Sequence, residues 1–210
     1  MKDLIIVGAS GFGREIVQYI EDCNAVEARW NILGFIDDNP NALDGVEHEF
    51  KVIGDIQNHE PRPDTEYICA LAFPQVKRKI VDLLKGRGAQ FATLIHPTAR
   101  VSRYAEIGEG CVITPASNVN TDAHVGQFAS ILASGIGHDA SVGDFSTLSG
   151  HVSVNGHVEI GEEVYMGCGA MIAPGKKVGN GATVGMGSVV IKNVKEGATV
   201  FGNPAKKISL

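Results

Sequence analysis

A histidine followed directly by an aspartate, His138-Asp139, is the pair in this chain best suited to acid–base chemistry. The ordinary pKa of an imidazole is about 6.5, so a histidine is largely neutral and able to accept a proton at physiological pH. The neighbouring carboxylate can fix the tautomer and stabilise the imidazolium, as a carboxylate does in a catalytic triad. We therefore expect His138 to be a general base oriented by Asp139; the alternative is a polar residue that only fills a corner.

A second candidate for chemistry is the glycine-rich turn Gly8-Ala9-Ser10-Gly11-Phe12-Gly13, which follows an apolar run and precedes a helical pattern. The amides of such a turn point at an anion from the N-terminus of the helix. The spacing is G-x-x-G-x-G, not the dinucleotide spacing G-x-G-x-x-G, and the first half of the chain holds only one such unit. We expect a mononucleotide and no nicotinamide chemistry.

The elements that position the glycine-rich turn alternate between strand and helix patterns from residue 1 to 92. The expected strands are 4–7, 32–36, 67–72 and 91–95. Apolar residues spaced by four mark two helix faces, which are Phe12, Ile16 and Ile20, then Val76, Ile80 and Leu84. Alternating strands and helices predict an α/β domain with a small parallel sheet.

The elements that position His138 follow a different rule, because aliphatic residues recur every six positions from residue 95 onward. The first series is Ile95, Val101, Ile107, Ile113, Val119, Val125 and Ile131; the second is Ile136, Val142, Leu148, Val154, Ile160, Met166, Ile172, Val178, Val184 and Val190. Six-residue periodicity is typical of a parallel β-helix, in which each hexapeptide forms one face of a prism and three faces form one coil. A β-sandwich would show a spacing of about 8–12 residues.

The two series are joined by a step of five residues, from Ile131 to Ile136, directly before Gly137-His138-Asp139. A shift of one residue would turn inward side chains outward, so the missing residue must be absorbed at a corner. Local departures of this kind mark functional sites, but a tolerated deletion explains the step equally well. His151 and His157 lie on successive faces and should not converge within one chain, so we expect no metal site.

Composition excludes several classes of protein. The chain has 210 residues, 44% hydrophobic and 20% charged, which suits a folded protein of one or two domains. A net charge of −6 offers no basic surface for nucleic acid, and the apolar runs are too short to cross a membrane. Four separated cysteines, without a C-x-x-C pair, suggest reduced thiols. We see no signal peptide and expect a cytoplasmic protein.

The hexapeptide array, the segment 181–190 and the tail Gly202-Asn203-Pro204-Ala205-Lys206 resemble the hexapeptide-repeat acyltransferases. The loop Gly8–Gly13, the segment Gly34-Phe35-Ile36-Asp37-Asp38 and Ile136-Gly137-His138-Asp139 narrow the resemblance to the NeuD/PglD-type sugar acetyltransferases. The resemblance implies a Rossmann-like nucleotide-sugar-binding domain, 1–92, followed by a left-handed parallel β-helix, 93–210. It also implies a homotrimer with active sites between subunits and acetyl-CoA as acetyl donor.

By the same resemblance, His138 is the general base, Asp139 orients it, and the backbone amide of Gly156 holds the acetyl carbonyl. Gly156 lies one coil of 18 residues after His138. The remaining residues expected to bind acetyl-CoA are Cys168, through its backbone, and Gly169, Ala170, Pro174, Gly187, Ser188, Pro204 and Lys206. We expect the thiol of Cys168 to be a small buried filler. Lys192, Lys206 and Lys207 are available to the CoA phosphates.

The resemblance assigns the substrate nucleotide to Gly8, Ser10, Gly11, Phe12, Gly13 and Arg14 around the diphosphate, and to Asp37 and Asp38 at the base or ribose. Thr147 occupies the place of a family histidine and could bond a sugar hydroxyl, and Ile131 replaces a family asparagine. The expected activity is acetyl-CoA-dependent N-acetylation of a nucleotide-linked amino sugar, with a UDP-sugar as the expected substrate, in glycan biosynthesis. The alternatives are O-acetylation of a sugar or sialic acid, a non-catalytic nucleotide-sugar-binding scaffold, and a zinc hydratase on the same fold.

Overall fold

The computed structural model describes residues 1–208, which form two compact units: the first is Met1–Pro97 and the second begins at Thr98. The predicted boundary falls between residues 92 and 93. The residues between the two positions, 93–97, hold a short strand and His96.

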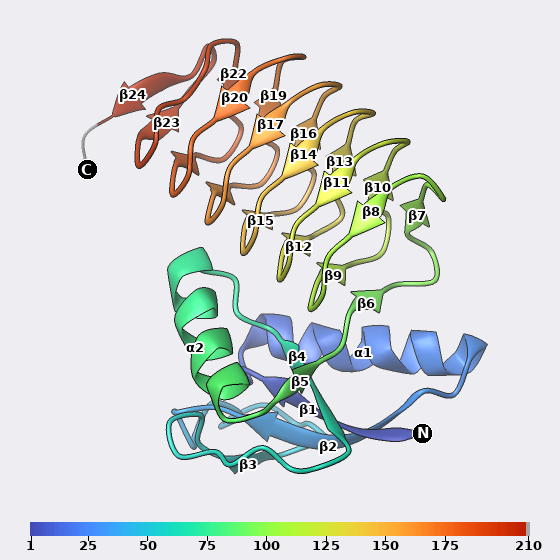
Figure 1. Cartoon of the computed structure of the whole chain (residues 1–210). Helices are drawn as coiled ribbons and strands as arrows, with labels where there is room; N and C mark the ends of the chain where they lie inside the picture. The colour runs from blue at the N-terminus through green and yellow to red at the C-terminus, as the bar shows by residue number, and fades with distance from the viewer. Residues whose placement is uncertain (209–210) are drawn as a thin grey trace. The chain divides into compact units, whose positions relative to one another are not determined.

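The first unit contains one parallel sheet in the order β3-β2-β1-β4-β5, with β1 in the centre (Figure 1). Its elements are β1 Lys2–Val7, α1 Gly11–Val26, β2 Trp30–Ile36, β3 Val52–Gly54, β4 Thr65–Cys69, α2 Pro74–Gly86, β5 Gln90–Phe91 and β6 Leu94–Ile95. The central strand carries the continuous apolar run 4–7, and all four of these side chains are fully buried. A parallel strand that is covered on both faces has a continuous apolar sequence of this kind. The parallel sheet with its two helices confirms the predicted α/β class.

Three details of the first unit differ from the sequence prediction. The short strand β3 was missed because three residues carry too little periodicity to detect. The expected strand 91–95 is interrupted between β5 and β6. In α2 the buried face holds Lys77, Ile80, Val81 and Leu84, whereas Val76 is half exposed. The face follows the i, i+3, i+4, i+7 pattern of a helix and is rotated by one residue from the predicted face.

The second unit is the predicted parallel β-helix, built from stacked two-residue strands (Figure 1). The strands are β7 Arg100–Val101, β8 Glu106–Ile107, β9 Val112–Ile113, β10 Asn118–Val119, β11 His124–Val125, β12 Ser130–Ile131, β13 Gly135–Ile136, β14 Ser141–Val142, β15 Thr147–Leu148, β16 Ser153–Val154, β17 Glu159–Ile160, β18 Tyr165–Met166, β19 Met171–Ile172, β20 Lys177–Val178, β21 Thr183–Val184, β22 Val189–Val190, β23 Thr199–Phe201 and β24 Lys206–Ile208. Three sheets run along the prism. Within the second unit their orders are β22-β19-β16-β13-β10-β7, β20-β17-β14-β11-β8 and β24-β23-β21-β18-β15-β12-β9, and β24 is antiparallel to β23.

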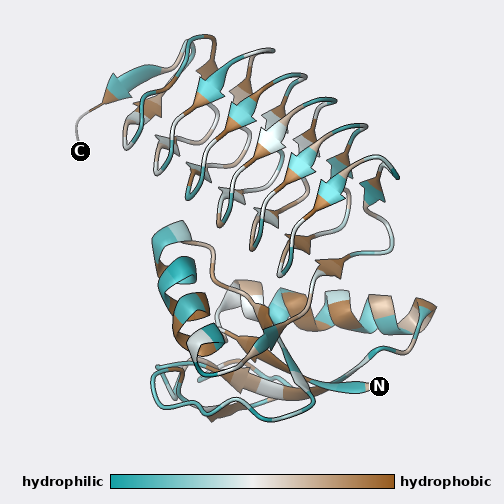
Figure 2. Cartoon of the chain, viewed as in Figure 1, coloured by the Kyte–Doolittle hydropathy of each residue, from teal (hydrophilic) through white to brown (hydrophobic). Residues whose placement is uncertain are grey.

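The predicted aliphatic residues of positions 113–190 all point into the prism and are at most 3% exposed. Figure 2 shows this apolar interior as brown segments along the stacked strands. The beginning of the first series is less well buried: Val101 and Ile107 are partly buried against the core, and Ile95 is 38% exposed. The prediction that Ile95 belongs to the inward series is therefore wrong.

The five-residue step is absorbed at a corner, as predicted. Val119 of β10 pairs with Ile136 of β13, seventeen positions on, whereas Ile136 pairs with Val154 of β16, eighteen positions on. Both Ile131 and Ile136 remain fully buried, so the missing residue comes from the corner between β12 and β13. Ser134 stabilises this short corner, because its Oγ accepts a hydrogen bond from the amide of Val152 at 3.0 Å.

Candidate functional site

The strand β13 ends directly before the corner that carries His138 and Asp139. Asp139 has a left-handed backbone, with φ of 56°, and its amide donates to the carbonyl of Thr121 on the preceding coil at 3.1 Å. The carboxylate Oδ2 of Asp139 lies 2.7 Å from Nδ1 of His138. Since an ionised carboxylate only accepts, Nδ1 carries the proton of the neutral imidazole and Nε2 keeps its lone pair. The pair therefore presents Nε2 as a proton acceptor.

Gly156 lies against that acceptor atom. A Cβ added to Gly156 would stand 2.7 Å from Nε2 of His138, so only glycine leaves room for the ring in this position. Gly156 follows β16 on the next coil, and its N–H makes no hydrogen bond within residues 1–208. An unpaired amide next to a base is suited to stabilising an oxyanion.

His157 is a neighbour that the sequence analysis missed. Its ring meets that of His138 edge to face, with centroids 5.0 Å apart, and its Nε2 lies 3.9 Å from Oδ2 of Asp139. Its amide donates to the carbonyl of His138 at 3.0 Å, which ties the two corners together. From the sequence, His157 was compared only with His151, six residues away. The coil length is the signal that finds it, because His157 follows the coil position of His138 by one residue.

A cavity of about 420 Å³ surrounds these groups. It is lined by Asn120, Gly135, Ile136, Gly137, His138, Ser153, Val154, Asn155, Gly156, His157 and Pro174. A second cavity, also about 420 Å³, shares Asn120 and His138 and extends to Arg100, Ser102 and Thr121 on earlier coils. His138 thus stands between two adjoining hollows, one on the side of Gly156 and one on the side of Arg100. Two substrates could approach the base from opposite sides.

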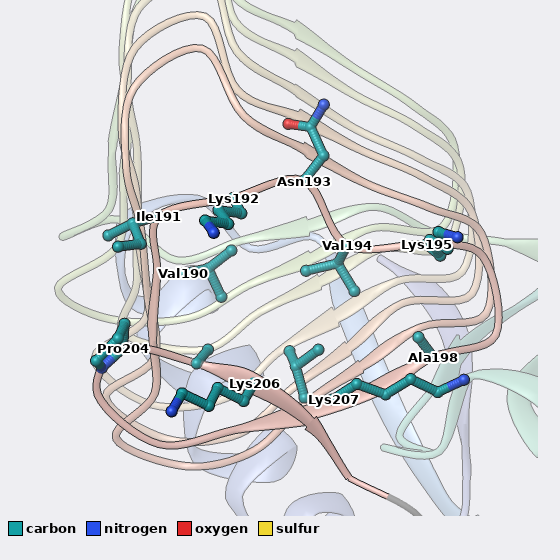
Figure 3. A pocket seen from close by; sticks show the side chains of 12 residues that line it. Val190, Ile191, Lys192, Asn193, Val194, Lys195, Ala198, Pro204, Lys206 and Lys207 are labelled. Atoms are coloured by element: carbon teal, nitrogen blue, oxygen red, sulfur yellow. The ribbon is translucent and has the colours of Figure 1, made fainter.

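The residues predicted to bind the donor are distributed along the prism. Gly156 and Pro174 line the cavity around His138, whereas Pro204 and Lys206 line another cavity of about 530 Å³ at the last coils. Figure 3 shows the cavity at the last coils. Val190 and Val194 lie within it, and the side chains of Lys192, Lys195, Lys206 and Lys207 lie around it.

Of the donor residues between these two places, Cys168 and Gly169 lie at one corner and Gly187 at the corner one coil later. The amide of Gly187 donates to the carbonyl of Cys168 at 2.9 Å. The side chains of Ala170 and Ser188 are fully buried. The thiol of Cys168 is exposed, so the prediction of a buried filler is wrong. The reason is its corner position, two residues after the inward-pointing Met166.

Thr147 is also placed differently from what a substrate contact needs. It lies on β15, is fully buried, and does not line either cavity next to His138. The structure therefore lends no support to a sugar contact from this side chain.

The glycine-rich turn joins β1 to α1. Gly8 has φ of 101°, and the amide of Ala9 donates to Oδ2 of Asp37 at 2.8 Å. Ser10 and Gly11 are exposed at the start of the helix, with Phe12 partly exposed. The side chain of Arg14 extends over Gly11, since a Cβ on Gly11 would lie 3.8 Å from Nη2. The turn therefore combines helix N-terminal amides with a cation, a combination that suits a phosphate.

Asp37 and Asp38 have structural partners within this unit. Besides its bond to Ala9, Asp37 accepts the amide of Asn39 at 2.8 Å. Asp38 accepts the amides of Ile56 and Gln57, at 2.9 and 3.1 Å. Asp37 thus hydrogen-bonds the glycine-rich turn to the residue after β2. Asp38 hydrogen-bonds the segment after β3 to the same end of β2.

Gly13 is required at its place in α1, because a Cβ there would stand 2.0 Å from the carbonyl oxygen of Gly8. Replacing Gly13 with alanine is expected to push the helix off the turn and to destabilise the first unit by about 1–3 kcal/mol. Chemical unfolding followed by Trp30 fluorescence measures this. Gly86→Ala at the end of α2 is the matched control, since nothing lies within 4 Å of a Cβ there. Equal stability of the two variants would contradict the prediction.

The histidine at the end of the first unit, His96, makes structural contacts. His96 is 5% exposed, its Nε2 lies 3.0 Å from Oδ2 of Asp22, and its ring packs edge to face on Tyr19. The hydrogen bond from His96 is the largest of the effects that hold the pKa of Asp22 below its ordinary value. Burial lowers the pKa of His59, whose Nε2 lies 2.9 Å from the hydroxyl of Tyr67.

A stacked hexapeptide β-helix with a histidine–aspartate pair beside a glycine amide is the arrangement that was expected from the sequence for an acyltransferase. Residues 3–84 match the family described as the PglD N-terminal domain. The acetyltransferase domain of PglB from Neisseria gonorrhoeae FA1090, solved in complex with acetyl coenzyme A, matches with a TM-score of 0.87 and 30% identity over 99% of each chain. The chain belongs to the NeuD/PglD-type sugar acetyltransferases.

Two relatives have more specific names. GDP-perosamine N-acetyltransferase of Escherichia coli O157:H7 is 31% identical over 152 residues, which are 69% of this chain and 66% of that protein. UDP-N-acetylbacillosamine N-acetyltransferase of Bacillus subtilis (strain 168) is 29% identical over 117 residues, 54% of this chain and 51% of that protein. The matches thus span about two thirds and about half of these relatives. Within residues 1–208, neither helix is long and apolar enough to span a membrane.

Proposed function

We propose that this protein transfers the acetyl group of acetyl-CoA to the amino group of a nucleotide-linked amino sugar, with His138 as general base. One observation carries the proposal. Nε2 of His138 faces Gly156 inside a cavity, and the backbone N–H of Gly156 has no hydrogen-bond partner within residues 1–208. Membership of the NeuD/PglD-type sugar acetyltransferases supports acetyl transfer to a sugar as the class of reaction. The proposed location is the cytoplasm.

The proposed reaction begins when the neutral amine of the sugar attacks the thioester carbonyl. The attack forms a C–N bond, and Nε2 of His138 takes the proton that the nitrogen must lose. Asp139 stabilises the imidazolium through Nδ1, at 2.7 Å. The amide of Gly156 donates to the oxyanion of the tetrahedral intermediate. Collapse of the intermediate breaks the C–S bond, and the proton on His138 passes to the departing thiolate of CoA.

Each side of His138 is assigned to one substrate in this proposal. Acetyl-CoA approaches from the side of Gly156 and Pro174, and its arm follows the coils past Cys168 toward Pro204 and Lys206. The amino sugar occupies the hollow that reaches Arg100. As a separate part of the proposal, the glycine-rich turn of the first unit binds a nucleotide. We further propose a homotrimer in which the donor lies between neighbouring subunits.

The nucleotide is the finer part of the proposal. The two relatives carry GDP and UDP in their names. The single strand-turn-helix phosphate loop of the first unit supports a mononucleotide over a dinucleotide. Between the two bases we propose UDP, as expected from the sequence.

An acceptor screen tests the function. Purified protein is incubated with acetyl-CoA and with UDP- or GDP-linked 4-amino sugars, and release of free thiol is measured. The corresponding 4-hydroxy sugars serve as controls for O-acetylation. Thiol release with UDP-amino sugars supports the whole proposal, and release only with GDP-amino sugars corrects the nucleotide. Release only with hydroxyl acceptors, or with none, would overturn N-acetyl transfer.

Asp139→Asn tests the orienting role within this mechanism. Asparagine tolerates the left-handed backbone of this position, so the fold should persist. The neutral amide cannot stabilise an imidazolium, and we expect kcat to fall by about 10²–10⁴-fold with a nearly unchanged KM for acetyl-CoA. Asp122→Asn is the matched control, because Asp122 has the same backbone conformation, with φ of 54°, at a corner of the preceding coil. An Asp139→Asn enzyme as fast as this control would refute the role.

Thiol labelling tests the path of the donor. Cys168 is exposed, whereas Cys23, Cys69 and Cys111 are buried, and burial raises the pKa of the Cys69 thiol to about 11. We therefore expect N-ethylmaleimide to modify one thiol rapidly in the native protein, at Cys168. Saturating acetyl-CoA, whose sulfur is blocked as a thioester and so does not consume the reagent, should slow this modification at least about tenfold, as read by mass spectrometry of peptides. Unchanged labelling in the presence of bound acetyl-CoA would place the donor elsewhere.

A further inference from the structure

We propose that His138, Asp139 and His157 form a reversible binding site for a transition-metal ion, best suited to Zn²⁺, whose occupation blocks the base. The binding of the ion stands on the geometry of the three side chains alone. Its inhibitory effect rests on the proposed function.

The three side chains converge from two coils of the β-helix. One ligand atom from each lies within 4.8 Å of the others. The measured separations are 2.7 Å from Nδ1 of His138 to Oδ2 of Asp139, and 3.9 Å from that oxygen to Nε2 of His157. Tetrahedral zinc with bonds of about 2.0–2.1 Å needs ligand atoms roughly 3.3 Å apart. The observed separations bracket this value.

The site can adjust by the remaining difference without disturbing the fold. The side chains of His138, Asp139 and His157 are 56, 46 and 66% exposed, so small rotations meet little resistance. The backbone beneath them is held by the bond from the amide of His157 to the carbonyl of His138. The anchor points are therefore fixed while the ligand atoms remain free to close on an ion, with water in the fourth position.

The donor set selects the class of metal. Two imidazoles and one carboxylate suit Zn²⁺, Co²⁺, Ni²⁺ and Cu²⁺, whereas Mg²⁺ and Ca²⁺ prefer sites made of oxygen.

The consequence for the base follows from the tautomer of His138. A metal on Nδ1 takes the lone pair there, and the proton that this nitrogen carried moves to Nε2. The atom that faces Gly156 then donates a hydrogen bond and has no lone pair to accept a proton from the amine. The ion thus inactivates the base by removing the lone pair of Nε2, and steric blockage of the cavity is not needed.

Metal binding is tested first, without any substrate. Full-length protein freed of metals is titrated with Zn²⁺ by calorimetry and with Co²⁺ by its visible absorption. We expect one ion per chain, and weakening of at least about tenfold in His157→Gln. His151→Gln is the matched control, since His151 has the same left-handed backbone at the corner six residues earlier, with φ of 61° against 58°. Equal affinity of wild type and His157→Gln would overturn the site.

Inhibition is tested separately, with the acetylated sugar measured by chromatography because thiol reagents and free CoA themselves bind zinc. Each variant is compared with its own metal-free rate. We expect Zn²⁺ to inhibit wild type and His151→Gln equally, His157→Gln to need at least about tenfold more, and a chelator to restore the rate. Binding without inhibition of an active enzyme would refute the block on the base. Binding to a protein that shows no acetyl transfer with any acceptor would count against the proposed function and leave the site standing.

Discussion

Replacing His138 with alanine is expected to lower kcat for acetyl transfer by about 10²–10⁴-fold, the usual contribution of a positioned general base. The physical reason is that, within residues 1–208, the three atoms nearest to a Cβ placed on Gly156 all belong to the ring of His138, with Nε2 the nearest at 2.7 Å. The nearest imidazole, on His157, directs its Nε2 toward Asp139, at 3.9 Å. The affinity for CoA should change little, because the alanine removes no backbone donor.

The measurement is a steady-state rate with saturating acetyl-CoA, together with calorimetric titration of CoA. His124→Ala is the control: His124 lies on β11, is exposed, and pairs with Glu106 outside both cavities next to His138. Near wild-type turnover by His138→Ala would show that the amine loses its proton to water or another group. The base assignment would then be wrong.

Replacing Gly156 with alanine should be almost as damaging, with a loss of about 10²–10³-fold in kcat, as for removal of an oxyanion donor. The added methyl group would stand 2.7 Å from Nε2 of His138, so either the ring or the coil must move. A displaced ring no longer faces the amine, and a displaced coil no longer aims the amide at the carbonyl. Both outcomes disturb the transition state.

Gly150→Ala separates this local effect from a general cost of alanine in the β-helix. Gly150 occupies the equivalent position one face earlier, and a Cβ there would meet nothing within 4 Å. We expect both variants to show similar thermal unfolding and only Gly156→Ala to lose activity. Equal activity of the two variants would contradict the arrangement of base and amide proposed above.

The repeat in the sequence predicted the β-helix well because its signal is redundant. Each coil contributes inward aliphatic residues at a fixed spacing, and a prism with a packed interior is the arrangement that buries all of them. For the first unit, the sequence predicted the α/β class correctly. It did not predict β3 or the correct buried face of α2. A three-residue strand and a helix face that includes the buried Lys77 carry little or no hydrophobic signal.

The candidate site was predicted in part. His138, Asp139 and Gly156 follow from a motif and a coil length, and the structure brings them together. His157 was missed because polar residues at corners do not follow the six-residue repeat of the inward aliphatic residues. The burial of Cys168 was predicted wrongly because the exposure of a corner side chain depends on the direction in which that one side chain points. Thr147 was chosen by analogy with a family position, and its burial on β15 could not be read from the chain.

The sequence by itself determined the repeating interior, the alternation of the first unit and the family, because these depend on the order and spacing of residue types. Only the tertiary structure decided which polar groups meet across neighbouring coils. Residues on stacked coils are about 17–18 positions apart, as Ser130 with Thr147 and Gly135 with Ser153 show. The directions of their side chains at the corners depend on backbone angles such as the left-handed φ of Asp139 and His157.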